Sequence, residues 1–203
     1  MKIICVGMNY AEHVKEFDNE MPTEPVIFTK PDSALVRPGF PFFYPEFSNN
    51  IHYEVELVIR INKVGKNIAE KFAHKYYHEM AIGIDFTARD IQLKAKEKGL
   101  PWALSKGFDG SAPLSEFREI AAFGDLNDIH FSLQQNGELR QSGHSKDMLY
   151  SVDKIIAYVS SFMTLKKGDL IFTGTPSGVG PVAIDDKLEA FIGDEKLLEV
   201  RVK

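Results

Sequence analysis

Two glutamates alternate with apolar residues in the segment HYEVELVIRI, residues 52–61, which is rich in β-branched side chains and is expected to form a strand. Side chains at positions i and i+2 of a strand point to the same face, so Glu54 and Glu56 should lie side by side. Adjacent carboxylates repel each other unless water or a cation compensates, and such oxygen ligands suit Mg²⁺, Mn²⁺ or Ca²⁺ rather than Zn²⁺. A solvated strand face would show the same pattern, so the pair alone leaves both interpretations open.

A third carboxylate, Asp85, ends the apolar run AIGID at residues 81–85. Burying a charge is costly unless the charge is paired or bound to a metal ion. Asp85 therefore either belongs to a charged site or caps the helix that is expected to begin near Thr87.

His13 and Glu16 stand three residues apart in a segment with helical spacing, so their side chains should be neighbours on the helix surface. A histidine that is oriented and charged by a carboxylate can act as a general base. The ordinary alternative is a solvated helix face, which uses the same residue types.

Two further segments offer groups for binding or charge stabilisation. Lys106 stands between apolar neighbours in ALSKGF, and residues 173–181 read TGTPSGVGP. In that second segment Gly174 would let the backbone approach a ligand closely, and Thr175 offers a hydroxyl. A surface lysine and a plain strand-to-loop turn are the ordinary alternatives.

The elements that must position these groups are strands and helices, with the strands outnumbering the helices. Strands are expected at 3–7, 25–31, 52–61, 81–87 and 169–176, and hairpins at 129–143 and 187–203 that turn at Asn136-Gly137 and Gly193-Asp194. Helices are expected at 9–17, 69–80, 88–99 (closed by Gly99) and 151–163, the last capped by Ser151 with Ile155, Ile156, Val159 and Phe162 facing inward. Hairpins imply antiparallel pairing, so the expected class is α+β with a curled or layered antiparallel sheet.

Composition narrows the class of protein. The chain has 203 residues, a formal net charge of −5 and one cysteine, Cys5, which suits one globular domain in a reducing compartment. The acidic balance disfavours nucleic acid or an anionic membrane as a partner. No apolar run approaches the roughly 20 residues of a membrane span, and the first residues are too polar for a signal peptide. We therefore expect a cytoplasmic protein.

Motifs of several enzyme classes are missing from the sequence. A Rossmann GxGxxG, the Gly-Lys-Ser/Thr ending of a P-loop and a GxSxG nucleophile elbow are all absent. His74 and His78 lack the neighbouring glutamate of a zinc protease and are expected on a solvated helix face.

In their order and spacing, the candidate features are similar to those of a known family. The matching strings are GMNYAEHVKE, PVIFTKP, NIHYEVELVI, GIDFTARDIQ, KGLPWALSKGFD, NGELRQSG and FTGTPSGVGP. They run from about residue 7 to residue 181, and the closing hairpin fits as well. The chain resembles the fumarylacetoacetate hydrolase family, particularly its acylpyruvate hydrolase and oxaloacetate decarboxylase branch.

This resemblance implies a role for each candidate residue. Glu54, Glu56 and Asp85 match three carboxylate ligands of Mg²⁺, with Mn²⁺ and Ca²⁺ as alternatives. Lys106 matches a lysine beside the metal that stabilises developing negative charge. His13 and Glu16 match a dyad on a helix that closes over the substrate. Four residues match the substrate pocket: Arg89, Gln92, Gly174 and Thr175. Met8 stands where close relatives often have arginine.

The fold implied by the resemblance is a mixed, mostly antiparallel β-roll flanked by helices, which usually assembles as a homodimer. One catalytic domain would span residues 1–203, with the lid helix in 1–48 and the β-roll core in 49–203. Longer family members carry an extra N-terminal domain and a further carboxylate ligand, so fumarylacetoacetate itself is not the expected substrate.

The implied activity is metal-dependent cleavage of a C–C bond in acylpyruvates (2,4-dioxo acids), which gives pyruvate and a carboxylic acid. The same site could decarboxylate or tautomerise oxaloacetate, since each reaction passes through an enolate of a 2-oxo acid. Two alternatives stay open: a dienedioate isomerase or decarboxylase of aromatic catabolism, and a non-catalytic protein that binds a dicarboxylate.

Overall fold

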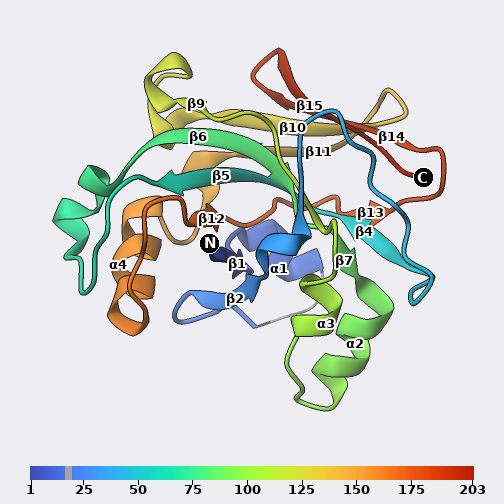
Figure 1. Ribbon diagram of the computed structural model, residues 1–203, viewed down its shortest axis with the longest axis horizontal. Coiled ribbons are helices and arrows are strands. Elements are labelled where there is room, and N and C mark those ends of the chain that lie inside the picture. Colours follow the sequence, from blue (N-terminus) through green and yellow to red (C-terminus); the bar gives the residue numbers. More distant parts are fainter. Residues whose placement is uncertain (17–19) are drawn as a thin grey trace.

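A six-stranded sheet occupies the centre of the computed structural model, which describes residues 1–16 and 20–203. Its strands, in spatial order, are β2 (Val26–Lys30), β1 (Ile3–Gly7), β12 (Leu170–Phe172), β5 (Val55–Ile61), β6 (Tyr77–Ile84) and β9 (Arg118–Glu119). The β1–β12 pair is parallel and the other pairs are antiparallel. β5 and β6 are long, curved strands that lie side by side (Figure 1).

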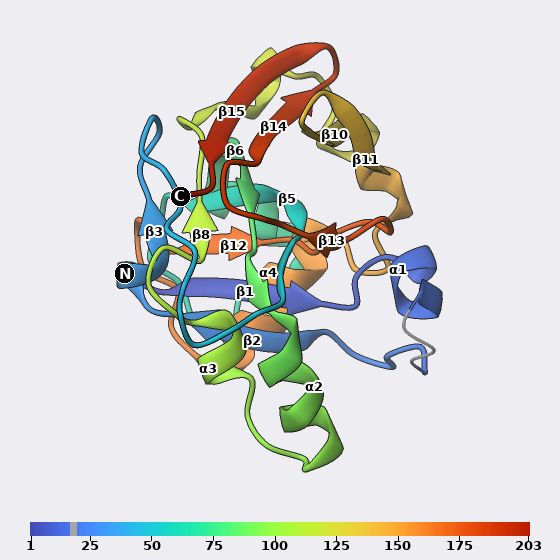
Figure 2. The same cartoon turned by 90° about the vertical axis from the view of Figure 1, so that its right-hand side faces the viewer.

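A second, antiparallel sheet has four strands, ordered β11 (Glu138–His144), β10 (His130–Gln135), β14 (Lys187–Ile192) and β15 (Glu195–Arg201). Both expected hairpins are present here. The first turns at Asn136 and Gly137, whose φ angles of 56° and 83° are those of a two-residue hairpin turn. This sheet lies over one side of the central sheet, at the top of Figure 2.

Two small sheets complete the strands. One joins β13 (Gly180–Pro181), β4 (Ile51–Tyr53) and β7 (Thr87–Ala88), and the other pairs β3 (Leu35–Val36) with β8 (Ala112–Pro113). The expected strand 52–61 is therefore interrupted at Glu54, between β4 and β5. Beside the break, Val55 N–H donates to Gln141 Oε1 at 2.9 Å, and Asp85 N–H donates to Glu54 O at 2.8 Å.

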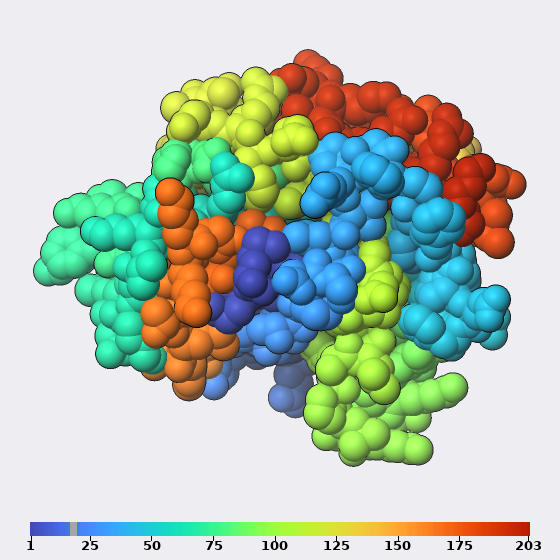
Figure 3. Space-filling model, in the orientation of Figure 1, coloured from blue at the N-terminus to red at the C-terminus, as the bar shows by residue number. Residues whose placement is uncertain are grey.

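The helices flank the sheets. They are α1 (Ala11–Glu16), α2 (Arg89–Glu97), α3 (Ala103–Lys106) and α4 (Val152–Phe162), with 3-10 turns at Asp32–Ala34, Glu70–Tyr76, Ile120–Ala122, Leu126–Asp128 and Ser145–Asp147. Ser151 caps α4, as expected, by accepting the Lys154 N–H. The segment that contains α2 and α3 protrudes at the lower right of Figure 3.

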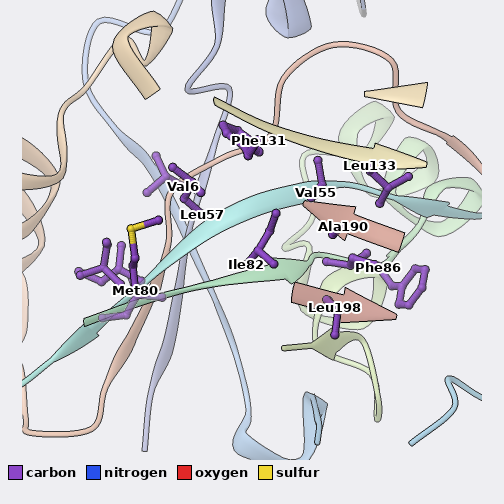
Figure 4. Packing of buried hydrophobic residues seen from close by; sticks show 14 of the residues in the cluster. Val6, Val55, Leu57, Met80, Ile82, Phe86, Phe131, Leu133, Ala190 and Leu198 are labelled. Carbon is purple, nitrogen blue, oxygen red and sulfur yellow. The ribbon is translucent and has the colours of Figure 1, made fainter. Parts of the chain in front are cut away.

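The main apolar core lies between the two larger sheets. Leu57 and Ile82, from β5 and β6, share this cluster with Phe131, Ala190 and Leu198 of the four-stranded sheet (Figure 4). Each of these side chains is almost fully buried. Because most of β5 and residues 80–84 of β6 are buried on both faces, a carboxylate placed there leaves water and must find a compensating charge.

Three expectations about local structure were wrong or only partly right. The helix expected at 69–80 is a 3-10 turn at Glu70–Tyr76, and the chain then enters β6, because the ladder pairs Tyr77 with Ile61 and Met80 with Ile59. Phe162, expected to face inward, is 68 % exposed. It lies on the side of α4 that carries the half-buried Tyr158, whose ring it contacts at 5.1 Å between centroids, whereas Val159 and Ser160 of the same turn face the core. The helix expected at 9–17 is α1, and Phe17 lies outside the described residues.

The fold class is confirmed: the structure is a mixed, mostly antiparallel roll of sheets flanked by helices. In the described part of the chain, no helix is long and apolar enough to span a bilayer.

Candidate active site

Three buried carboxylates meet where β4, β5 and β6 end or begin. Glu54 stands at the break before β5, Glu56 is on β5, and Asp85 directly follows β6, whose last residue pairs with Val55. One ligand atom from each lies within 4.8 Å of the others. Their exposed fractions are 5 %, 2 % and 0 %, so the pair expected on β5 is not on a solvated strand face. Asp85 does not cap α2 either, since that helix begins at Arg89 after an Ala88 N-cap.

Lys106, from the short helix α3, reaches into the same group. Its Nζ lies 2.8 Å from Glu54 Oε2, 2.7 Å from Asp85 Oδ2 and 2.6 Å from Thr87 Oγ1. Arg89, the first residue of α2, donates to Glu54 Oε1, and also to Gln92 Oε1 at 2.5 Å. Both cations expected from the sequence are therefore in contact with the carboxylates.

Lys30 is a third cation at the site, and sequence reasoning missed it. It ends β2, is 2 % exposed, and places Nζ 2.7 Å from Asp85 Oδ1. The available signal was a charged residue at the end of the apolar run VIFTK, the same signal that singled out Asp85. Thr87 and Gln141 were also missed; Gln141 holds Thr175 Oγ1 at 2.8 Å.

The carboxylates differ in how well their charges are compensated. Burial alone would raise the pKa of Glu54, but the charges of Lys106 and Arg89 lower it well below its usual range. Burial raises the pKa of Glu56 well above its usual value, and the charges of Asp85 and Glu54 raise it further. Burial opposes the charged form of Lys106, yet the same two acids, Asp85 and Glu54, raise its pKa above normal.

Glu56 is the carboxylate that most needs a cation. Its Oε2 accepts the Gly174 N–H at 2.7 Å, and within residues 1–16 and 20–203 it takes part in no ion pair. A buried, uncompensated carboxylate beside two others is the donor chemistry of a site for a hard divalent ion. The residues present thus fit a metal ion bound by carboxylate oxygens.

The His13–Glu16 dyad is formed as expected. His13 Nδ1 lies 3.0 Å from Glu16 Oε2, and Glu16 Oε1 accepts the Gly178 N–H at 3.1 Å. Glu16 therefore ties α1 to the loop after β12 while it orients the imidazole.

One cleft joins these groups. Eight of the predicted site residues line it: His13, Glu54, Glu56, Asp85, Arg89, Gln92, Lys106 and Thr175. The other two do not line the cleft: Glu16 contacts the His13 imidazole, and Gly174 N–H donates to Glu56. Met8, which the sequence singled out, also lines the cleft. Five further lining residues were not expected from the sequence: Val6, Gly7, Phe28, Lys96 and Trp102.

A second cluster of possible ligands, Asp128, His130 and His144, lies at the end of the β10–β11 hairpin. His144 Nδ1 accepts the Lys146 N–H at 3.1 Å, so the ring proton belongs on Nε2, which lies 2.9 Å from Asp128 Oδ1. A metal ion would need a lone pair on that same nitrogen. The cluster is therefore better described as an Asp–His contact than as a metal site.

The chain is similar to known proteins over almost its whole length. The family described as fumarylacetoacetate (FAA) hydrolase C-terminal matches residues 2–203. The chain belongs to the fumarylacetoacetate hydrolase family. One relative in this enzyme family is "Oxaloacetate tautomerase FAHD1, mitochondrial" of Mus musculus, which is 44 % identical over 201 residues, 99 % of this chain and 91 % of the relative.

Two solved structures of family members place the fold. Fumarylpyruvate hydrolase from Pseudomonas aeruginosa, in complex with Mn²⁺ and pyruvate, superposes with a TM-score of 0.94 at 38 % identity, over 100 % of this chain and 89 % of that one. 2-hydroxyhepta-2,4-diene-1,7-dioate isomerase from Mycobacterium marinum has a TM-score of 0.86 at 33 % identity, over 99 % and 73 %. The expected family is confirmed. Its members similar to this chain include an oxaloacetate tautomerase and a fumarylpyruvate hydrolase, and a dienedioate isomerase shares the fold.

Proposed function

We propose that this chain is a divalent-metal-dependent enzyme that cleaves acylpyruvates to pyruvate and a carboxylic acid. The observation that carries the proposal is one cleft that joins three buried carboxylates to Lys106 and to the His13–Glu16 dyad. Glu54, Glu56 and Asp85 would hold the ion, with Mg²⁺ as the resident metal. A divalent ion bound there would supply Lewis-acid stabilisation of an enolate oxygen of the substrate.

The chain's own residues supply the rest of the chemistry. Lys106 brings a fixed positive charge into a buried site, where stabilisation of developing negative charge is strongest. Arg89, Gln92 and Thr175 line the cleft with donors for the substrate's carboxylate and oxo groups. Thr175 is held in place by Gln141, so its hydroxyl is oriented before a substrate arrives.

His13 is the general base in this proposal. Glu16 holds its Nδ1 side, which leaves the imidazole oriented toward proton removal from a water molecule. That water attacks the distal carbonyl of the acylpyruvate, the C–C bond breaks, and the electron pair is left on the pyruvate enolate. Protonation of the enolate then gives pyruvate.

Keto–enol exchange of oxaloacetate is a second candidate, and the 44 % identity to an oxaloacetate tautomerase favours it. It needs the ion site and Lys106 but no attacking water. Decarboxylation of oxaloacetate is a variant of the same enolate chemistry. The dienedioate reaction and a non-catalytic binding role are the remaining alternatives, and the intact dyad and cation set weigh against the latter.

A small substrate panel tests the proposal. Metal-stripped protein is given Mg²⁺, Mn²⁺ or no metal and is then assayed with acetylpyruvate, fumarylpyruvate and oxaloacetate. We expect metal-dependent release of pyruvate from an acylpyruvate, measured with a coupled assay, and metal-dependent enol exchange of oxaloacetate, measured by ultraviolet absorbance. No pyruvate from any acylpyruvate in the presence of metal would contradict the hydrolase proposal.

The dyad separates the two reactions. We expect His13→Ala to bind metal like the wild type but to slow acylpyruvate hydrolysis by about 10²–10⁴-fold, the usual contribution of general acid–base catalysis. Glu12→Ala, which removes an exposed ion pair to Lys15 on the same helix, is the matched control. Hydrolysis by His13→Ala at the wild-type rate would disprove the role of the dyad.

We also propose that the chain is a cytoplasmic homodimer. Phe40 and Phe43, in the segment before β4, are 64 % and 71 % exposed, which is the kind of apolar surface that a second copy covers. Analytical ultracentrifugation of wild type and Phe43→Ser would test the dimer.

A further inference from the structure

We propose that Lys30 is a positioning residue that selects a small divalent ion over a larger one, by keeping one oxygen of Asp85 away from the metal. The inference rests on the proposed binding of a metal ion by Glu54, Glu56 and Asp85. It concerns a lysine that does not line the cleft and therefore acts through Asp85 rather than on a substrate.

Lys30 is built into the structure behind Asp85. Its Nζ lies 2.7 Å from Asp85 Oδ1, and both side chains are 0 % exposed. This contact is ionic and lacks the alignment of a hydrogen bond. The same ammonium donates to Ser111 Oγ at 2.9 Å and to the carbonyl oxygens of Phe86 and Ser111 at 3.2 Å each, and also to Lys106 O. These acceptors surround the ammonium, so it cannot swing away from Asp85.

The two oxygens of Asp85 are therefore not equivalent. Oδ1 faces the Lys30 ammonium, whereas Oδ2 faces Lys106 and the cleft, at 2.7 Å from Lys106 Nζ. A second cation cannot approach Oδ1 closely without strong repulsion from Lys30 in this buried setting. Asp85 can thus offer the metal one oxygen only.

The two oxygens of each glutamate also differ in their contacts. Glu56 Oε2 accepts the Gly174 N–H, and Glu54 Oε1 accepts from the Arg89 guanidinium. In each carboxylate one oxygen thus contacts Lys30, Arg89 or Gly174. The second oxygens of Glu54 and Asp85 contact Lys106 Nζ, so the ion would compete with Lys106 for those two oxygens. Three carboxylates that each present one oxygen provide three ligand atoms, not six.

One oxygen per carboxylate favours one class of ion. Ca²⁺ takes six to eight oxygens and commonly binds carboxylates through both oxygens, whereas Mg²⁺ is smaller and binds one or two carboxylates while it keeps several waters. A lysine that enforces single-oxygen binding therefore lowers the affinity of the site for Ca²⁺ more than its affinity for Mg²⁺. Arg89 lines the cleft and Gly174 donates through its backbone, whereas Lys30 can be removed by a side-chain substitution that does not change the cleft lining.

The test compares the affinities of Mg²⁺ and Ca²⁺ for wild type and Lys30→Met by isothermal titration calorimetry of metal-stripped protein, with no substrate present. Both ions carry the same charge, so the loss of the lysine charge changes both affinities in the same direction. The ratio of the two affinities then reports the coordination. We expect the ratio to move toward Ca²⁺ by about tenfold, because Asp85 gains a second available oxygen.

Lys2→Met is the matched control. It removes another Lys–Asp pair of the central sheet, between Lys2 and Asp169. Lys2 precedes Ile3, the β1 residue that pairs with Lys30, but neither Lys2 nor Asp169 lines the cleft, so the ratio should stay unchanged. A ratio in Lys30→Met within about twofold of the wild-type ratio would overturn the inference. If wild type binds neither ion, the proposed metal site itself is wrong, and the inference falls with it.

Lys30→Met leaves several buried carbonyls without a donor, so it could fail to fold, and a second measurement uses wild-type protein alone. Infrared difference spectra on addition of Mg²⁺ or Ca²⁺ report the separation between the antisymmetric and symmetric carboxylate stretches. This separation is wide for a carboxylate bound through one oxygen and narrow for one bound through both. We expect wide separations with both ions; a narrow separation with Ca²⁺ would overturn the inference.

Discussion

The Lys106 ammonium lies 2.7 Å from Asp85 Oδ2, the oxygen of Asp85 that faces the cleft. It also lies 2.8 Å from Glu54 Oε2. These are the two oxygens that a divalent ion would use, so Lys106 and the ion compete for the same ligands. In this arrangement the lysine balances the site's charge and, in the proposed reaction, stabilises the enolate.

Because Lys106 and the ion compete for the same oxygens, removing Lys106 should raise the affinity for the metal and lower the catalytic rate. We expect Lys106→Met to bind Mg²⁺ about tenfold more tightly, because a repelling charge next to the ion is gone, and yet to lose enolate chemistry. The single tryptophan, Trp102, lines the same cleft, and its fluorescence can follow the metal titration. Lys154→Met, which lacks an exposed contact to Glu70, is the control; weaker binding by Lys106→Met would contradict the competition.

The Glu56 carboxylate should destabilise the metal-free protein and be required for metal binding. Its buried charge is opposed by Asp85 and Glu54, so we expect Glu56→Gln to raise the free energy of unfolding at pH 7 in the presence of EDTA by about 1 kcal/mol. The same variant should lose the rise in melting temperature that Mg²⁺ gives the wild type.

The control for Glu56→Gln is a glutamate on the neighbouring strand with the opposite electrostatics. A hydrogen bond from Arg60 lowers the pKa of Glu79, so Glu79→Gln should lower stability slightly and keep the Mg²⁺ effect. Chemical denaturation of both variants, each in EDTA and in Mg²⁺, gives the four unfolding free energies to compare with wild type. A Glu56→Gln protein that is less stable in EDTA than wild type would refute the prediction.

Much of the site was visible in the sequence because each group broke a local pattern. Glu54 and Glu56 interrupted an apolar strand, and Asp85 ended another, so their chemistry could be inferred before their contacts were known. The antiparallel β5–β6 register explains why they meet, since it places Ile84 opposite Val55. Residue roles such as those of Arg89 and Gln92 came from the family resemblance, and the structure confirms only that they line the cleft.

The rest depends on contacts between distant segments. Lys30 is separated from Asp85 by fifty-five positions, and nothing local indicates that the two meet. The helix expected at 69–80 had helical spacing, but pairing of Tyr77 and Met80 with β5 overrides it, because tertiary contacts outweigh weak intrinsic preferences. The break at Glu54 likewise depends on Gln141, which supplies an acceptor for Val55 N–H from another sheet.

Gly174 is required by both its backbone angle and its surroundings. Its φ is +100°, and an added Cβ would lie 2.7 Å from Asn9 Cβ and 3.1 Å from Val6 O. We expect Gly174→Ala to cost about 3 kcal/mol or more of unfolding free energy and to weaken metal binding, because Gly174 N–H holds Glu56. Gly168→Ala has a similar φ of +91° with nothing within 4 Å and should cost about 1–2 kcal/mol. Equal losses in the two variants would show that the close approach does not matter.

Asp169 should govern part of the stability toward acid. It is 1 % exposed and accepts from Lys2 N at 2.9 Å, from Lys2 Nζ and from Lys166 N at 2.8 Å. Burial opposes its charge, but these donors hold the pKa of its carboxyl below the ordinary value. A carboxyl whose pKa is lowered on folding adds stability above its unfolded pKa, about 3.9, and loses it as the pH falls through the folded pKa.

We therefore expect Asp169→Asn to lose about 1–3 kcal/mol of unfolding free energy at pH 7, and the difference from wild type to shrink as the pH is lowered below about 4. Asp185→Asn, which removes an exposed pair to Lys203 at 3.1 Å, should change stability by less than about 0.5 kcal/mol at any pH. Urea denaturation between neutral and acidic pH measures all three proteins. A difference between Asp169→Asn and wild type that stays constant down to the acid transition would mean that the ionised carboxylate is not what the Lys2 and Lys166 donors stabilise.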